Sequence, residues 1–187
     1  MDSIAESFST RCGFPGLVGA FDGTHIPIPA PVSEHRASFI IRKGYASIRL
    51  QVECDTKFRF LDTSTGWPGS IYDARVLRNS AVSGTIQELP EQFHVLSDLA
   101  YGLTTNLLVP YRDTGHLDRT QKLFNKAHAS IRVDVERAIG LLKCNFRRPK
   151  FLDMLLIEDI PDVVTASCVL HKFILDRQAE DDVRQLV

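Results

Sequence analysis

Apolar residues in the first two thirds of the chain gather in short runs that predict β-strands. The run LVGAFDGTHIPI (17–28) is rich in β-permissive residues and is closed by prolines, so it predicts the first strand. FHVLSDL (93–99) predicts a short buried strand that ends near Asp98, and LLVPY (107–111) predicts another that a proline closes. Apolar runs of this length suit strands better than helices.

The segments SIRLQVECD (47–55) and KFRFLDTSTG (57–66) predict a hairpin. In the first of them, apolar and polar residues alternate with a period of two, which is typical of a strand that buries only one face. The apolar positions are Leu50, Val52 and Cys54, and the polar positions are Gln51, Glu53 and Asp55.

Three later segments predict helices. Ser70 follows a chain break at Trp67-Pro68-Gly69 and could cap a helix that runs from about Tyr72 into the eighties. From 120 to 146, apolar residues recur at steps of four and three and form one stripe. The last segment, Pro161 to Arg177, begins with proline and predicts a mostly buried helix, with a frayed tail after it. The stripe consists of Leu123, Ala127, Ile131, Val135, Ile139 and Leu142.

The order of these elements predicts an α/β fold in which a mixed sheet is covered by helices. A chain of 187 residues suits one domain, and its 44% hydrophobic and 24% charged residues are ordinary for a globular protein. No apolar run approaches the ~20 residues that a membrane span needs, so we expect no membrane partner. The first residues do not resemble a secretory signal, so we expect an intracellular protein.

The four cysteines are scattered and contain no C-x-x-C pair, so we expect reduced thiols. Cys168 and His171 form a C-x-x-H pair, but they lie on an apolar helix with no partner pair nearby. We therefore interpret both as core residues and not as metal ligands.

The net charge of −1 hides a strong local asymmetry. Between 111 and 151, ten Lys/Arg stand against four Asp/Glu, which gives +6, whereas 152–187 has three against eight, or −5. Such basic stretches favour a polyanion partner, although a solvated helix face explains each one equally well. A second basic cluster lies upstream and consists of Arg36, Arg42, Lys43 and Arg49.

Three carboxylates occupy positions that are unusual for solvated charges. Asp22 falls inside an apolar strand, Asp98 ends another, and Glu136 borders the apolar stripe of the long helix. Carboxylates brought together at strand ends repel each other, and a divalent cation with oxygen ligands removes that penalty. Spacing alone leaves the alternative open, because Asp22 could be a turn residue and Glu136 a partner of Arg132.

Motifs around these acids narrow the interpretation. The first aspartate lies in GFPGLVGAFDGTHIPIPAP (13–31), the second in VLSDLAYGLTTNLLVPYR (95–112), and the glutamate in FNKAHASIRVDVERAIGLLKCNFR (124–147). In this order, and with compatible gaps, the segments resemble those of PIF/Harbinger transposases and their domesticated nuclease relatives, from about residue 13 to 176. The other matching segments are RKGYASIRLQVECD (42–55), WPGSIYDARVLRNS (67–80) and CVLHKFI (168–174).

The resemblance implies an RNase H-like fold and a DDE triad at Asp22, Asp98 and Glu136. It adds Asp73, from the P-G-S-x-x-D segment, as a fourth metal ligand, and it implies Mg²⁺ or Mn²⁺ as the cofactor. DNA would be the substrate, a separate Myb-like DNA-binding protein a partner, and the nucleus the location, with the cytoplasm as a further one. Basic residues would border the DNA path, namely Arg132, Arg137, Lys143, Arg147 and Arg148.

The same resemblance divides the chain into a short N-terminal extension (1–12), a catalytic domain (13–176) and an acidic tail (177–187). One departure concerns the second aspartate, which the family follows with Ser-Gly-Tyr-Pro and this chain with Leu-Ala-Tyr-Gly. A bulky Leu99 beside a ligand could alter its supporting contacts. Two functions therefore stand as hypotheses: a metal-dependent DNA nuclease, and an inactive domesticated domain that serves as a scaffold for DNA or protein.

Overall fold

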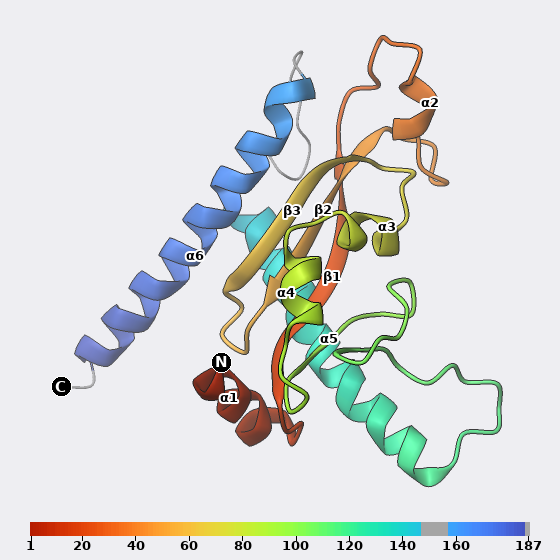
Figure 1. Ribbon diagram of the computed structural model, residues 1–187. Helices are drawn as coiled ribbons and strands as arrows, with labels where there is room; N and C mark the ends of the chain where they lie inside the picture. Colours follow the sequence, from red (N-terminus) through yellow and green to blue (C-terminus); the bar gives the residue numbers. More distant parts are fainter. Residues whose placement is uncertain (147–156, 186–187) are drawn as a thin grey trace.

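The computed structural model describes residues 1–146 and 157–185 (Figure 1). A five-stranded mixed sheet has the order β3-β2-β1-β4-β5, with helices on both faces. The expected α/β architecture is confirmed, and it is consistent with an RNase H-like fold. The strands are β1 (Leu17–Pro27), β2 (Ser47–Cys54), β3 (Phe60–Pro68), β4 (His94–Leu96) and β5 (Leu107–Leu108). The helices are α1 (Asp2–Cys12), α2 (Arg36–Phe39), α3 (Asp73–Arg78), α4 (Val82–Gln87), α5 (Arg119–Asn145) and α6 (Ile160–Gln185), and a 3₁₀ turn (Ile157–Asp159) precedes α6.

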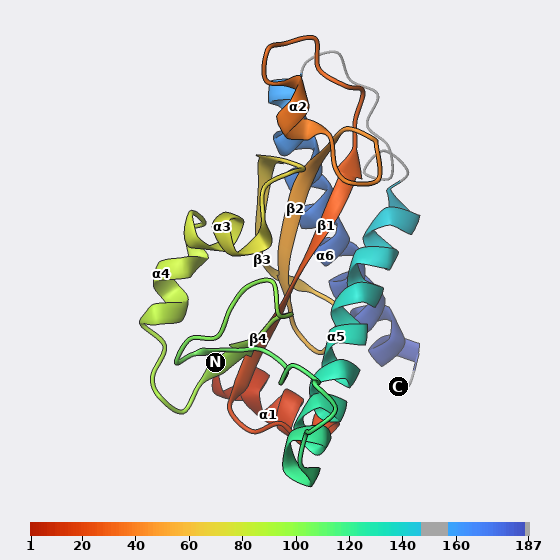
Figure 2. The ribbon, with the colours of Figure 1, turned by 90° about the vertical axis from the view of Figure 1, so that its right-hand side faces the viewer.

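The central strand β1 separates two hydrophobic cores. It pairs antiparallel with β2 and parallel with β4. On one face, Ala20 and Ile26 pack with buried residues of α5 and α6; on the other, Phe21 packs with α3 and α4. Figure 2 shows the sheet edge-on between these two layers. Since neighbouring residues of a strand point to opposite faces, each position of β1 is committed to one layer.

The expectation that β2 buries only one face is wrong. Its apolar residues lie in the core under α5 and α6, as predicted, but Gln51 and Glu53 on the other face are buried as well. Short helices and loops pack on that second face and exclude water from it. The alternation of apolar and polar residues within one strand cannot predict whether other elements pack on its polar face. Burial, followed by the nearby Asp62 carboxylate, raises the pKa of Glu53 to about 8.

The single helix expected after Ser70 is two short helices, and Tyr72, not Ser70, is the N-cap of α3. Between α3 and α4, the Asn79 side chain donates to the carbonyl of Arg75 and the Ser80 hydroxyl to that of Leu77. Side-chain bonds of this kind compete with helix continuation. The break therefore arises from local hydrogen bonding, without a proline or glycine.

The two long helices differ from expectation at one end each. Asp118 and Gln121 form a capping box at the start of α5. The first residue of the predicted stripe, Leu123, is exposed, because the first turns of α5 extend past the sheet (Figure 1). Helix α6 continues to Gln185, past the predicted end at Arg177, and no Gly or Pro interrupts this stretch. No helix among the described residues combines the length and apolarity of a membrane span.

The cysteine interpretation is confirmed, since all four thiols are free and both Cys168 and His171 are buried in α6. Residues 1–12, which the sequence sets apart as an extension, form α1 and contribute Phe8 to the main core.

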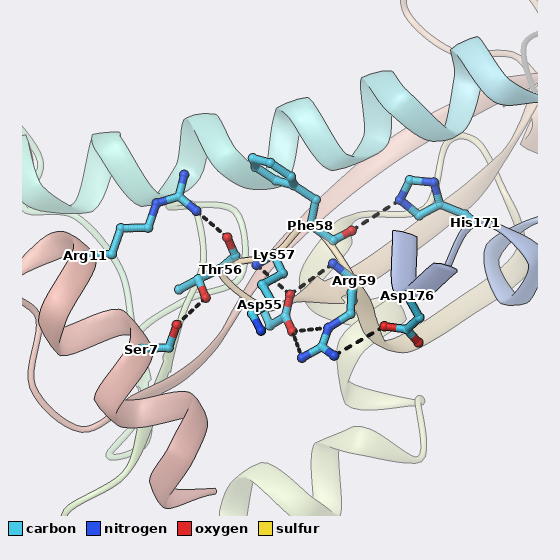
Figure 3. Close-up of polar contacts among 9 residues, drawn as sticks. All are labelled: Ser7, Arg11, Asp55, Thr56, Lys57, Phe58, Arg59, His171 and Asp176. Atoms are coloured by element: carbon cyan, nitrogen blue, oxygen red, sulfur yellow. Dashed lines mark hydrogen bonds and ion pairs between the residues drawn. The ribbon is translucent and has the colours of Figure 1, made fainter. Parts of the chain in front are cut away.

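The β2–β3 turn connects three helices to the sheet (Figure 3). Buried Asp55 accepts hydrogen bonds from two backbone amides of the turn and from Arg59, which also reaches Asp176 of α6 at 3.3 Å. His171 of α6 bonds the carbonyl of Phe58, and Arg11 of α1 bonds both the carbonyl of Thr56 and the Asp134 carboxylate of α5. Asp55 thus holds the turn in its conformation through its hydrogen bonds to the turn amides and to Arg59.

The two carboxylates that bind Arg59 should differ in their contribution to stability. We expect Asp55→Ala to lower the free energy of unfolding by about 3 kcal/mol, because it leaves the backbone amides of the turn without an acceptor and removes the buried carboxylate partner of Arg59. The control Asp176→Ala removes a half-exposed pair and should cost less than about 1 kcal/mol. Urea unfolding followed by circular dichroism measures both values, and equal losses would contradict the assigned role of Asp55.

Glu53 should make stability depend on pH. A carboxyl group whose pKa is about 8 in the folded protein, against 4.5 as its ordinary value, takes up a proton on folding between these limits. The contribution of Glu53 to the free energy of unfolding is present below pH 4.5 and is lost as the pH rises to 8. The free energy of unfolding should fall over this range by up to about 1.4 kcal/mol per pH unit. In urea unfolding at several pH values, Glu53→Gln should remove this slope. The exposed control Glu91→Gln should leave it unchanged.

Candidate active site at the centre of the sheet

Asp22 lies in the middle of β1, on the face that α5 covers. It shares this face with Ala20 and Ile26 and is only 9% exposed. Its carboxylate accepts a hydrogen bond of 2.8 Å from the backbone amide of Gly23. Burial is the main cause that raises the pKa of Asp22 to about 6; the Gly23 amide and Arg132 oppose the shift, and the carboxylates of Asp98 and Glu136 add to it. This buried carboxylate is therefore incompletely neutralised by its surroundings.

Asp98 follows the end of β4 by two residues. The parallel register pairs Ala20 of β1 with Leu96, the last residue of β4, so Asp22 and Asp98 are each two residues further along. The amide of Ser97 bonds the carbonyl of Leu108 at 3.0 Å, which keeps the chain beside β5 up to this point. The charge of Asp98 acts on Asp22 and contributes to its raised pKa. Alternation from Leu96 places Asp98 on the α5 face, the same face as Asp22. The two aspartates that the sequence predicts as catalytic are neighbours.

Glu136 approaches these aspartates from α5. It lies at the border of the buried stripe, half exposed, and Arg132 one turn earlier is 3.4 Å from its carboxylate. This ion pair lacks the geometry of a hydrogen bond, since Arg132 Nε has no hydrogen-bond partner among the described residues. An exposed pair at this helical spacing is worth only ~0.3–0.5 kcal/mol. Glu136 can therefore exchange Arg132 for another cation at little cost.

The fourth predicted acid, Asp73, approaches β1 from the opposite face. A Cβ built on Gly23 would collide with the Asp73 carboxylate, and Gly23 points away from the α5 face because its neighbour Asp22 points toward it. Asp73 is held by Arg49 at 2.7 Å, and both side chains are mostly buried. Burial, with a contribution from Asp98, raises the pKa of Asp73, while Arg49 lowers it.

The four acids do not form a closed ligand set as they stand. Across residues 1–146 and 157–185, no three side chains of the His, Cys, Asp or Glu type are arranged so that they could hold a metal ion. Asp22, Asp98 and Glu136 gather at one face of β1, whereas Asp73 is bound to Arg49 across the strand. All four offer the oxygen donors that Mg²⁺ and Mn²⁺ prefer, so the chemistry of the set fits these ions.

The predicted basic residues of α5 divide between two sides of the helix. Lys143 donates to the hydroxyl of Thr24 at 2.7 Å and to the carbonyl of His25 at 3.2 Å, and therefore lies beside the aspartates. Arg132 lies on the same side, next to Glu136. Arg137 points away and is 3.7 Å from Asp134 on the opposite border. Arg147 and Arg148 lie outside the described residues.

Tyr101 is a part of the site that the sequence did not identify. It is buried beside Gly23, and its hydroxyl has no hydrogen-bond partner among the described residues. Burial is the main cause that raises its pKa, and the carboxylates of Asp73, Asp22 and Asp98 add to it. A signal was present, because Tyr101 stands three residues after Asp98, where the family motif also has tyrosine. Leu99 is 46% exposed and does not crowd the aspartate.

Comparisons with known proteins identify a family and several relatives. A family model described as DDE superfamily endonuclease matches residues 21–172. The chain is 31% identical over 182 residues to "Putative nuclease HARBI1" of Rattus norvegicus, covering 94% of this chain and 51% of that protein. It is 29% identical over 195 residues to "Protein ALP1-like" of Arabidopsis thaliana, covering 95% and 48% respectively. The chain spans about half the length of these relatives, and no solved structure gives a significant match.

The close approach at Gly23 should make this position intolerant of any side chain. We expect Gly23→Ala to destabilise the fold by about 1–3 kcal/mol, because its methyl group would displace Asp73 from Arg49. The matched control Gly140→Ala lies in the middle of α5 with open space around it, and should stabilise by about 1 kcal/mol. Thermal unfolding of both variants should thus show shifts of opposite sign. A gain of stability in Gly23→Ala would mean that Asp73 does not hold this position.

Proposed function

Because the chain belongs to the DDE superfamily endonucleases, we propose that it is the catalytic part of a metal-dependent nuclease that hydrolyses phosphodiester bonds of DNA. One observation supports this most strongly: Asp98 follows β4, the parallel neighbour of β1, by two residues, and its charge and that of Glu136 on α5 both act on Asp22. These three residues are the proposed catalytic acids. The chain matches about half the length of its relatives. The function of a whole protein of that length is part of the same proposal.

Mg²⁺ or Mn²⁺ is the proposed cofactor, with Asp22, Asp98 and Glu136 as its ligands. Divalent ions bound there would activate a water molecule and stabilise the leaving oxygen of the phosphodiester. The electrostatics of the chain support such a site, since the pKa of Asp22 is raised by burial and by the other two carboxylates. A divalent cation offsets both effects and holds Asp22 in its ionised form.

Asp73 is the proposed fourth ligand, but the protein already supplies it with a cation. To join a metal ion on the α5 face, it would have to leave Arg49, and breaking a mostly buried pair of this kind costs several kcal/mol. Glu136 has only a half-exposed pair to break. We therefore expect Asp73 to contribute less to metal affinity than the other three acids do.

DNA is the proposed substrate, and Lys143 and Arg132 are the basic residues best placed to meet its phosphates beside the acids. Arg137 would contact DNA only at a distance from the acids, because it faces Asp134. Arg147 and Arg148 remain part of the proposed DNA path on the basis of the sequence. A Myb-like DNA-binding partner and a nuclear location, with the cytoplasm as a further location, complete the proposal.

A scaffold without catalytic activity is the second candidate function. It is favoured by the arginine partners of Glu136 and Asp73, which balance these charges within the protein itself. A scaffold would keep the fold and the basic surface and would need no metal ion. Binding of metal ions and cleavage of DNA therefore distinguish the two functions.

We expect the purified chain to nick or linearise supercoiled plasmid in the presence of Mn²⁺, at a rate that Asp22→Asn and Asp98→Asn lower by about 100-fold or more. Supporting contacts around a metal commonly contribute 10–100-fold in affinity or activity, and a direct ligand should contribute at least as much. The control Glu88→Gln removes an exposed charge far from the acids and should keep the wild-type rate.

Thermal unfolding with increasing Mn²⁺ supplies the second measurement. A metal ion at 100 times its dissociation constant stabilises the folded state by about 2.7 kcal/mol, and Asp22→Asn should lose this gain. A wild-type chain that neither cleaves plasmid nor gains stability from Mn²⁺ would establish the scaffold and refute the nuclease. Stabilisation by Mn²⁺ that persists in Asp22→Asn would place the metal ion elsewhere.

A further inference from the structure

A second cavity lies along β1 from the acids, at the end of the sheet near α2 (Figure 1). It has a volume of about 470 Å³, within the range of small-ligand sites. His25, three residues beyond Asp22, belongs to its wall, and alternation along β1 places it on the face opposite to Asp22, the face of Arg49 and Asp73. The other walls come from the turn after α2 and from the segment that leads into α3; among them are Ile41, Arg42, Lys43, Arg49 and Tyr72.

Backbone contacts hold these walls in place without a ligand. The amide of Gly69 bonds the carbonyl of Ser47 at 2.8 Å, and the amide of Ile41 bonds the carbonyl of Tyr45 at 3.0 Å. A Cβ on Gly69 would overlap the side chain of Ser47 and come within 2.7 Å of Ile41, so only glycine permits this approach. Arg49 bonds the carbonyl of Ile71 at 3.0 Å and fixes the segment beside it.

The cavity carries positive charge that the described part of the protein does not neutralise. Arg49 is neutralised by Asp73, but Arg42 and Lys43 have no carboxylate within ion-pair distance among residues 1–146 and 157–185. Burial, then Arg49, Lys143 and Lys43, lower the pKa of His25 to about 4, so the ring is neutral near pH 7 and adds no charge of its own. The site therefore favours an anion.

An aromatic surface stands beside these cations. The side chain of Tyr72 is 70% exposed although it lines the cavity, and Ile41 supplies an apolar wall. Cations next to an exposed aromatic ring match the two parts of a nucleotide, its phosphate and its base. A simple phosphate site would need no exposed ring, and the cavity is far too small for a double helix.

We propose that this cavity binds one unpaired nucleotide of the DNA substrate, with Arg42 and Lys43 at its phosphate and Tyr72 against its base. The inference rests on the proposed nuclease function. It concerns a part of the DNA substrate that does not contact the catalytic acids. The recognised DNA thus carries an overhang or an opened base. Stacking on tyrosine tolerates any base, so the cavity selects unpaired structure and not sequence.

The test measures binding of the whole chain by fluorescence anisotropy in EDTA, where no cleavage occurs. The probes are a blunt duplex and the same duplex with a four-nucleotide 3′ or 5′ overhang. We expect the wild type to prefer one overhang, and Tyr72→Ala to weaken binding of that probe about tenfold without affecting the blunt duplex. Tyr72→Phe should keep the preference. Tyr45→Ala, in the same turn but outside the cavity wall, is the matched control and should bind as the wild type does.

The charged part of the site has its own measurement. Replacing Arg42 and Lys43 together by alanine should lower the salt dependence of overhang binding by about 0.7 units of log K against log salt, the value for one phosphate of a single strand. The control removes two exposed lysines elsewhere, Lys57 and Lys172, and changes the net charge equally. Equal slopes for the two double variants would overturn the proposal, and so would a Tyr72→Ala variant that binds like Tyr45→Ala. Displacement by inorganic phosphate with no effect of Tyr72→Ala would also overturn it, because it would reveal a bare anion site.

The binding measurements can also be distinguished from a failure of the nuclease proposal. An overhang preference that depends on Tyr72, in a chain that cleaves no plasmid, would uphold the cavity and refute the nuclease. Cleavage that depends on Asp22, without any overhang preference, would do the reverse. The Asp22→Asn variant should keep the preference in EDTA, because Asp22 faces the side of β1 opposite to the cavity.

Discussion

Burial of β1 on both faces is the constraint on which the rest of this structure depends. A strand in this position commits each side chain to one of two cores, so Asp22 must face α5 and Gly23 must face the opposite layer. The parallel register of β4 then brings Asp98 to the face of Asp22. The missing side chain at Gly23 leaves room on the other face, and Asp73 and Tyr101 fill it. One strand thus brings acids to both of its sides within two consecutive residues.

The ion pairs that Arg49 and Arg132 form with the acids differ in strength. This difference determines which acid can exchange its partner for a metal ion. Arg49 and Asp73 form a mostly buried pair, whereas Arg132 and Glu136 are both largely open to solvent. Solvent screens the second pair, which leaves Glu136 free to exchange partners, while removal of either member of the first pair exposes an unpaired buried charge. Glu136, on the α5 face, is therefore free to change its partner, whereas Asp73, on the opposite face of β1, is held in place by Arg49.

The sequence allowed the prediction of features that depend on local pattern. The bounds of β1, the β2–β3 hairpin, the order of the strands and the length of α5 all follow from apolar periodicity and turn residues, whereas α1 and α2 were not predicted. Two of the errors share one cause, since both depend on distant parts of the chain that cover a surface or leave it open. Gln51 and Glu53 are buried because α3, α4 and nearby loops exclude water from their face, and Leu123 is exposed because α5 begins beyond the sheet. The face from which Asp73 reaches β1 depends on the path of the chain after β3, about which no motif carries information.

The distribution of charge along β1 also bears on how DNA could approach the acids. Phosphates are repelled by carboxylates, and the +6 stretch of the sequence offsets this only where its cations contact the DNA, because the Debye length in physiological salt is about 8 Å. Arg42 and Lys43 line a cavity on the face of β1 opposite to Asp22, so their effect requires a strand that passes through their own cavity. Lys143 bonds to the Thr24 hydroxyl and therefore lies on the face of the acids. The cations nearest Asp22 and those of the cavity are thus on opposite faces of the sheet, and a phosphate backbone that meets both must pass around this end of β1.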